Sequence, residues 1–318
     1  MKTTISIIIP TYRPNSNLLR TLNKLSKICI NGAYLMEVII INTISKIKID
    51  DLVRKNQYLF QLKIINIEKN KFNHGDTRNL GIDRSKGEYI IFLSQDAYPV
   101  EANFIEYFIE DLNKKNIVAV FGKEIAPNKA PKRYLYNEQA LWFKQYERFY
   151  DKKKRVLFNN KIRSMSQNPD DLIFWYSLSN VFSCYKRSFL KKHRFETIYH
   201  GEDVLMGKFI INNGFEKMFD SRCAVEHFHN DLQNYVKRSI NDWYFRIFVL
   251  KSGLHTKINE KINLKTEKNQ NILNIFDICF YYLLKIFILI AVLLIRLKQI
   301  ILTRFMKEKK IEYVRKYI

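Results

Sequence analysis

The sequence predicts an α/β fold in which helices flank a mostly parallel sheet, followed by a C-terminal helical tail. Short β-branched runs alternate with segments of helical periodicity between residues 5 and 122, which is typical of βα units. The chain has 318 residues, 47% of them hydrophobic, enough for one large domain with an appendage. We therefore expect a main domain at residues 1–255 and a basic, apolar-helix region at 256–318.

Each expected element follows from a local pattern. Apolar, β-branched runs predict strands at Ile5–Pro10, Met36–Asn42, Leu62–Ile67, 88–94 and Ile117–Gly122. Helical spacing and capping residues predict helices at 15–28, at 76–87 with Gly87 ending it, at 101–116, and from Glu202 to a stop at Gly214. Between about residues 130 and 171 the pattern loosens into basic, aromatic-rich sequence.

The composition restricts the setting and the partners. The net charge of +23 predicts an anionic partner, although a general richness in Lys, Ile and Asn accounts for part of it. The basic residues form no nucleic-acid reading motif, so nucleic acid is not expected. The four cysteines form no C-x-x-C pair, which fits a reducing, cytosolic setting. The apolar run Ile5–Ile9 is too short for a signal peptide.

Polar side chains follow several predicted strands, and ligands of parallel sheets lie outside the carboxyl ends of the strands. This predicts a nucleotide site formed by Pro10, Thr11, Tyr12, Asn42, Gln95 and Asp96. The carboxylate of Asp96 can hold a divalent cation against phosphates. A turn-forming aspartate before Pro99 is the alternative.

The segment FNHGDTRNLGIDRSKG adds three candidates for binding the donor: His74, Arg78 and Asn79. We expect Arg78 and Asn79 to open a helix, where backbone N–H groups and a guanidinium suit a diphosphate. A solvated loop with an ordinary cap is the alternative.

The segment HGEDVLMGKFIINNG places Glu202 and Asp203 at the start of a helix. A carboxylate crowded by a neighbouring acid has a raised pKa and suits a general base. A simple helix cap is the competing interpretation.

The segment AVEHFHND is compatible with a strand end that carries His227 and His229 on one face. His227, with His229 as alternate, could complete a metal site with Asp96, since imidazole and carboxylate suit Mn²⁺ or a similar ion. A histidine bonded to a backbone carbonyl is equally compatible. Trp175 and Asn180 are candidate sugar contacts, with core packing as an equal alternative.

In this order these segments resemble glycosyltransferase family 2, and more narrowly its bacterial rhamnosyltransferase-like branch. The resemblance covers about Ile5 to Asn230, and its most specific part joins H-G-x-T-R-N to L-S-Q-D-A. It implies a single GT-A (Rossmann-like) domain that transfers a sugar from a nucleotide donor with inversion. It also implies a divalent cation, Mn²⁺ or Mg²⁺, and L-rhamnose from dTDP-rhamnose as the donor sugar.

The resemblance further implies roles for single residues. Asp96 matches the last Asp of the family's D-x-D metal motif, with Ser94 in place of the first. Asp203 matches the catalytic base of its E-D motif, and His227 the histidine that completes the metal site. Thr11 and Tyr12 match positions that line the nucleotide. Asn42 stands where the family has an acid that contacts the base, which leaves the identity of the base open.

The run Ile278–Ile295 is 18 residues long, is interrupted only by Lys285, and is flanked by basic residues on both sides. It predicts a helix that lies in the cytoplasmic leaflet, so that the protein would be peripheral or monotopic on the inner face of the cell membrane, near a glycan or lipid-linked acceptor. A helix packed against a second subunit in a homodimer is the alternative. A non-catalytic, membrane-bound polyanion-binding protein on a degenerate transferase fold is the second functional hypothesis, because of Asn42 and the shortened metal motif.

Overall fold

The computed structural model describes residues 2–28, 34–53, 56–127, 137–161, 172–228, 232–245, 283 and 286–297. The chain divides into two compact units. The first comprises Met1–Pro131, Glu138–Ser166 and Trp175–Phe228, and the second Lys132–Asn137, Gln167–Phe174 and His229–Ile318. The expected boundary between residues 255 and 256 lies outside the described residues and stays a prediction.

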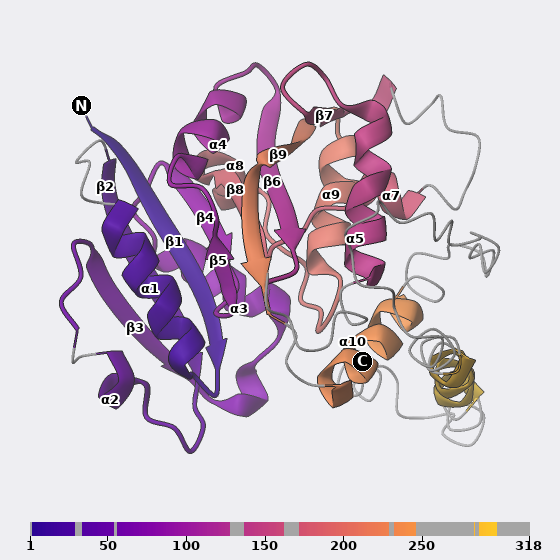
Figure 1. Cartoon of the computed structure of the whole chain (residues 1–318), viewed down its shortest axis with the longest axis horizontal. Helices are drawn as coiled ribbons and strands as arrows, with labels where there is room; N and C mark the ends of the chain where they lie inside the picture. Colours follow the sequence, from indigo (N-terminus) through magenta and orange to yellow (C-terminus); the bar gives the residue numbers. More distant parts are fainter. Residues whose placement is uncertain are drawn as a thin grey trace, which may run out of the picture. The chain divides into compact units, whose positions relative to one another are not determined.

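A nine-stranded sheet forms the centre of the first unit, in the order β3-β2-β1-β4-β8-β6-β9-β5, with β7 beside β9 (Figure 1). Neighbouring strands among β1 to β4 are parallel, and so are β6 and β9. β8 is antiparallel to both β4 and β6, while β5 and β7 are antiparallel to β9. The bounds are β1 Thr3–Tyr12, β2 Tyr34–Thr43, β3 Gln61–Ile67, β4 Tyr89–Leu93, β5 Ala97–Pro99, β6 Ile117–Ile125, β7 Arg155–Phe158, β8 Phe182–Lys186 and β9 Glu216–His227.

The mostly parallel α/β sheet is confirmed, and all five strands expected from the sequence are present. β8 was not among the expected strands. It inserts between β4 and β6 against the common direction, so the sheet is not the simple βα series that the sequence pattern indicated.

Helices cover both faces of this sheet. On one face, α1 (Ser16–Ile28), α2 (Ile49–Val53) and α4 (Phe104–Leu112) pack into the main core, and Figure 1 shows α1 lying over β1 to β3. The side chains of Leu18, Leu22 and Leu25 are fully buried there, as their helical spacing predicts. The remaining helices of this unit include α3 (His74–Arg84), α8 (Arg187–Lys192) and α9 (Glu202–Asn212). α9 ends before Gly214, whose φ of +77° favours glycine, as expected.

The bounds of α3 correct one expectation. The helix begins at His74 because Asn73 caps it, its side-chain oxygen accepting a hydrogen bond from the Asp76 N–H at 2.7 Å. Extended backbone at Ser85 ends the helix two residues before Gly87. Arg78 and Asn79 therefore lie within the helix rather than opening it, and Gly87 does not end it.

In the aromatic-rich stretch that begins near residue 130, residues 138–161 pack onto the sheet. The stretch contributes a short helix α5 (Asn137–Lys144), a 3₁₀ turn (Gln145–Phe149), β7 and the short helix α7 (Leu172–Tyr176). The ring of Tyr146 is fully buried and stacks on Phe219 of β9, with ring centroids 4.3 Å apart. This stretch thus extends the core over the β7–β9 part of the sheet.

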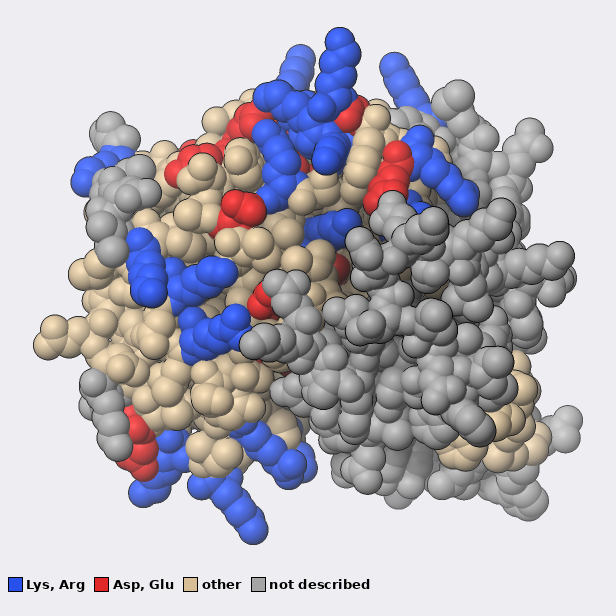
Figure 2. All heavy atoms as spheres, in the orientation of Figure 1, with Lys and Arg blue, Asp and Glu red and all other residues tan. Residues whose placement is uncertain are grey.

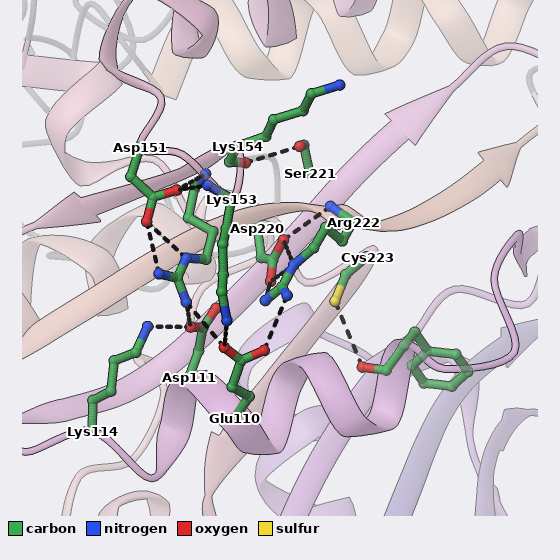
Figure 3. Close-up of polar contacts among 12 residues, drawn as sticks. Glu110, Asp111, Lys114, Asp151, Lys153, Lys154, Asp220, Ser221, Arg222 and Cys223 are labelled. Carbon is green, nitrogen blue, oxygen red and sulfur yellow. Dashed lines mark hydrogen bonds and ion pairs between the residues drawn. The ribbon is translucent and has the colours of Figure 1, made fainter.

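An ion-pair network surrounds the bulge of β9, between the two parts of that strand that pair with β6 (Figure 3). The network joins three parts of the fold, which are α4, the turn before β7, and the strand β9. We call it the α4–β9 network, and its members are Glu110, Asp111, Lys114, Asp151, Lys153, Arg155, Asp220 and Arg222. Arg155 lies 2.9 Å from the buried carboxylate of Asp111, and Arg222 lies 2.6 Å from that of Asp220. The network holds the strand that delivers His227.

The second unit contains α10 (Leu232–Tyr244) and a described helical segment at residues 286–297. In that segment Ile288 and Val292 are buried, whereas Ile286, Phe287, Ile290, Leu293 and Leu294 are exposed. Within the described part of the chain, none of the helices has the length and apolar character needed to cross a bilayer. Most of the predicted tail lies outside the described residues, and its association with a membrane or a second subunit stays a prediction.

Candidate active site

The carboxyl ends of β1, β2 and β3 bring three polar side chains into one row. Thr11, Asn42 and Asn66 are register partners across these strands. The amide of Asn42 is buried and donates a hydrogen bond to Asn66 Oδ1 at 2.8 Å. Asn42 Oδ1 is also buried, and no described group donates to it. A buried acceptor without a donor costs stability, so this atom is well placed to accept a bond from a ligand.

Gln95 ties the end of β1 to the turn after β4. Its side-chain oxygen accepts from the Tyr12 N–H at 3.2 Å, and its amide donates to the Tyr12 carbonyl at 3.0 Å. Pro10 lies within β1, two residues before Tyr12. The side chain of Gln95 thus positions the backbone around Tyr12, and donor contacts by Pro10, Thr11, Tyr12, Asn42 and Gln95 stay predictions.

Asp96 and His227 meet as the sequence predicts. Asp96 Oδ1 lies 3.5 Å from His227 Nε2, and about a third of the Asp96 side chain is exposed. The register of β5 with β9 sets this approach, since Ala97 pairs with His227. His227 Nδ1 lies 2.7 Å from Glu124 Oε2 on β6. Burial opposes a charge on this histidine, but Asp96 and Glu124 outweigh it and raise the pKa of His227 to about 9.

Glu124 was not among the residues predicted from the sequence, and it lies two residues beyond the strand expected at Ile117–Gly122. Its position behind His227 depends on the pairing of β6 with β9, which sequence periodicity does not reveal. The signal in the sequence that could have identified Glu124 is an acidic residue at the end of a buried strand.

The donors at Asp96 and His227 suit a divalent cation. A carboxylate that holds the far nitrogen of a histidine orients the near nitrogen toward a metal, and Glu124 does this for His227. No cluster of three or more His, Cys, Asp or Glu that could hold a metal occurs in the described ranges. Two protein ligands fit a cation that takes its other ligands from phosphate and water. His229, the alternate ligand, lies outside the described residues.

Glu202 and Asp203 are the first two residues of α9, and Arg78 of α3 faces them. Arg78 Nη1 lies 2.8 Å from Glu202 Oε1, and both side chains are buried. Burial alone would raise the pKa of Glu202, but Arg78, with smaller contributions from His74, His200 and a backbone hydrogen bond, outweighs it and lowers that pKa. Arg78 therefore pairs with the acid, and its predicted contact with the donor diphosphate stays untested.

Asp203 is held differently. Its Oδ1 accepts from the Val204 N–H at 2.8 Å, and its Oδ2 accepts from the Asn180 N–H at 3.4 Å. Burial, followed by the nearby charge of Glu202, raises the pKa of Asp203 to about 7. A carboxylate with this pKa can accept a proton near neutral pH, which suits general-base catalysis.

The other candidates lie close to these residues but have protein partners. Asn180 is buried, and its Oδ1 accepts from Ser183 Oγ at 2.9 Å and Tyr185 Oη at 2.8 Å. The buried Trp175 ring packs against Phe158 and Phe149. Their sugar contacts stay predictions.

Two further donor candidates belong to α3. Burial lowers the pKa of His74 to about 4, so its ring is neutral at pH 7, and Nδ1 lies 3.3 Å from Arg78 Nη1. Asn79 bonds the backbone of Phe195 with both ends of its amide, at 2.9 and 3.1 Å. Asn79 therefore ties α3 to the segment after α8, while the donor contacts predicted for His74 and Asn79 are untested.

Comparison with known proteins shows which family the chain belongs to. The chain is 29% identical over 229 residues to the O-antigen chain rhamnosyltransferase RfbN of Salmonella typhimurium, covering 71% of this chain and 67% of RfbN. It is 28% identical over 197 residues to the O-antigen chain rhamnosyltransferase WbaN of Salmonella anatum, covering 58% of each protein.

Solved structures show a similar fold. TarS of Staphylococcus aureus in complex with UDP-GlcNAc matches with a TM-score of 0.55 and 19% identity, over 79% of this chain and 65% of that one. The mannosyltransferase PcManGT of Pyrobaculum calidifontis, in complex with GDP-Man and Mn²⁺, matches with a TM-score of 0.56 and 12% identity, over 77% of this chain and 62% of that one. The chain thus spans less than two thirds of WbaN and of both solved structures, and these structures support a GT-A-like fold.

The family model for glycosyl transferase family 2 matches residues 6–172, more than half of the chain. That range contains the Thr11–Asn42–Asn66 row, Arg78, Asp96 and Glu124. The chain therefore belongs to glycosyl transferase family 2, and it is a glycosyltransferase by membership of that family.

Proposed function

We propose that this protein transfers a sugar from a nucleoside diphosphate donor to a hydroxyl group of a glycan or lipid-linked saccharide, with inversion at the anomeric carbon. The observation that carries the proposal is Asp203, a carboxylate with a pKa of about 7 at the start of α9. General-base catalysis needs this combination of proton affinity and a fixed position.

In the proposed reaction, the acceptor oxygen attacks C1 of the donor sugar while Asp203 takes the proton of that hydroxyl. The bond between C1 and the diphosphate oxygen breaks, and the nucleoside diphosphate leaves with the bonding electron pair. Attack on the face opposite the leaving group inverts the configuration. Arg78 and Glu202 hold the start of α9, and the charge of Glu202 keeps the pKa of Asp203 high.

Asp96 and His227 would hold the divalent cation, Mn²⁺ or Mg²⁺. When bound, such a cation supplies positive charge next to a diphosphate and so stabilises the charge of the leaving group. Glu124 would orient His227 through Nδ1.

For the donor we propose L-rhamnose carried on dTDP. The support is the similarity to RfbN over 71% of the chain and to WbaN over 58% of it, since their names identify both as O-antigen chain rhamnosyltransferases. The Thr11–Asn42–Asn66 row supports a base contact at the carboxyl ends of β1 to β3. By the same similarity, the acceptor would be a growing surface polysaccharide or its lipid-linked precursor.

We further propose that the protein works at the inner face of the cell membrane. The net charge of +23 supports this location, and lysine and arginine outnumber acidic side chains on the face shown in Figure 2. The exposed apolar side chains at residues 286–297 would contact the lipid.

The test is sugar transfer by the full chain with dTDP-rhamnose, UDP-GlcNAc and GDP-mannose, each with Mn²⁺ or with EDTA. We expect metal-dependent release of dTDP that requires an acceptor. Asp203→Asn should still bind the donor, measured as a rise in melting temperature, but should not transfer the sugar. Donor binding without transfer by the wild-type protein, across a panel of acceptors, would instead favour a non-catalytic binding protein.

A further inference from the structure

The segment Ser177–Asn180, which we call the 177–180 segment, contacts both halves of the proposed site. Ser179 Oγ donates to Glu124 Oε1 at 2.6 Å, and Glu124 in turn holds His227. The next residue, Asn180, donates its N–H to Asp203 Oδ2 at 3.4 Å. Two adjacent residues of this segment thus link the support of the proposed cation site to the proposed base.

A buried amine holds the other end of this segment. Lys217 on β9 has no exposed surface, and its Nζ donates a hydrogen bond to the Ser177 carbonyl. The same Nζ lies 3.9 Å from the centroid of the Phe158 ring and 5.2 Å from that of Phe121. Burial lowers the pKa of Lys217 well below its ordinary value, and the amine can donate to the carbonyl.

Two further contacts fix the segment against its surroundings. Tyr146 Oη donates to Ser177 Oγ at 3.0 Å. α9 packs directly on the residue before the segment, because a Cβ at Gly207 would lie 2.0 Å from the Tyr176 carbonyl oxygen. A shift of the segment would therefore disturb the helix that begins with Glu202 and Asp203.

We propose that Lys217 is a positioning residue, whose buried amine fixes the 177–180 segment and thereby sets Asp203 relative to Asp96 and His227. This inference rests on the proposed function. It explains why a long polar side chain occupies a fully buried position on β9, where an aliphatic residue would pack without a polar group to satisfy. A lysine that only fills space would be replaced by an apolar side chain of similar size at little cost.

The experiment compares Lys217→Met with Lys217→Gln. The two introduced side chains have similar length, but only glutamine can donate to the Ser177 carbonyl. We expect Lys217→Met to lower kcat about tenfold or more, because small misplacements of catalytic groups are costly. KM for the donor should stay within about twofold. Lys217→Gln should recover part of the lost kcat.

Phe158→Leu is the matched packing control, because it alters the same aromatic surroundings and leaves the amine–carbonyl bond. It should lower the melting temperature and keep kcat within about twofold of wild type. The pH dependence of kcat gives a second readout. If Asp203 loses the Asn180 N–H in Lys217→Met, its carboxylate is less stabilised and the midpoint moves to higher pH.

Unchanged kcat in Lys217→Met would overturn the proposal, as would an equal loss of kcat in Phe158→Leu. If Lys217→Met does not fold, the Tyr146→Phe variant tests the positioning of the 177–180 segment. This substitution removes the second hydrogen bond to Ser177 and keeps the aromatic ring. A fall in kcat at constant donor KM supports the proposal, and an unchanged kcat contradicts it. Absence of transfer by the wild-type protein with every donor would contradict the proposed function itself.

Discussion

The α4–β9 network and the Glu202–Asp203 pair both concentrate charge in the first unit, but they satisfy it differently. In the network, a lysine or arginine contacts each acidic residue (Figure 3). Arg222 bonds both oxygens of the buried Asp220. At the acid pair, Arg78 contacts Glu202, whereas backbone N–H groups bond Asp203.

We infer from this difference that the α4–β9 network stabilises the fold, whereas the Glu202–Asp203 pair takes part in catalysis. In the network, burial raises the pKa of Asp220, but the hydrogen bonds and the charge of Arg222 oppose that rise and favour the charged carboxylate. The partly buried carboxylate of Asp203, beside another acid and bonded by neutral donors, has a pKa of about 7 and can exchange its proton. Replacing an aspartate by asparagine should therefore lower kcat at the Glu202–Asp203 pair and lower stability in the α4–β9 network.

The largest expected effect comes from replacing Asp203 by asparagine. Asp203→Asn removes the proton acceptor and should lower kcat by about 10²–10⁴-fold. The melting temperature should stay the same or rise, because a buried charge next to Glu202 disappears. Steady-state transfer and thermal unfolding of the same preparation measure both effects.

Asp220→Asn is the matched control in the network. It leaves the Arg222 guanidinium with Glu110 as its remaining carboxylate partner and should cost about 2 kcal/mol of stability. The kcat of the folded protein should not change. A comparable loss of kcat in both variants would show that the two regions do not differ in the way proposed.

Arg155→Met should produce the next largest effect, on stability alone. Arg155 is an ion-pair partner of Asp111, whose side chain has no exposed surface, while Lys114 remains as a second partner. Breaking this pair should cost about 2 kcal/mol, measured as a shift of the denaturant midpoint at constant m-value. An equal or greater stability in the variant would mean that the network is not a source of stability.

Local sequence pattern predicted much of the fold but little of the site's connectivity. Apolar runs closed by Pro10 and Asp96 located β1 and β4, and they also located the polar residues at their ends. The pattern did not predict the antiparallel β8, because its place between β4 and β6 depends on long-range pairing.

Contacts between side chains from distant parts of the sequence are likewise not predicted by local pattern. The E-D segment identified Glu202 and Asp203, yet the pairing of Arg78 with Glu202 and of Glu124 with His227 joins segments far apart in the chain. The expected helix start at Arg78 was wrong, because the cap at Asn73 places the start of α3 at His74. The guanidinium pairs with Glu202, and its contact with a diphosphate stays a prediction.

Glu202→Gln should shift the pH dependence of kcat. Asp203 acts as a base only when deprotonated, so kcat should rise with pH through a midpoint near the pKa of about 7. Removing the charge of Glu202 lowers that pKa and leaves Arg78 uncompensated, which lowers it further. The midpoint should fall by about one pH unit, measured from rate profiles at saturating donor. A midpoint that stays in place would mean that Glu202 does not set the pKa of the base.

Asn42→Ala should have the smallest effect, confined to donor binding. The buried Oδ1 of Asn42 is without a described donor, and a ligand N–H would supply one. Loss of this bond should weaken binding of the nucleoside diphosphate by about fivefold, while kcat at saturating donor stays unchanged. Asn66→Ala provides a comparison within the same row, because it removes the acceptor of the Asn42 amide and leaves Asn42 Oδ1 in place. If titration calorimetry finds equal affinity in wild type and Asn42→Ala, the base does not contact this residue, and its site must be sought elsewhere along the carboxyl ends of β1 to β3.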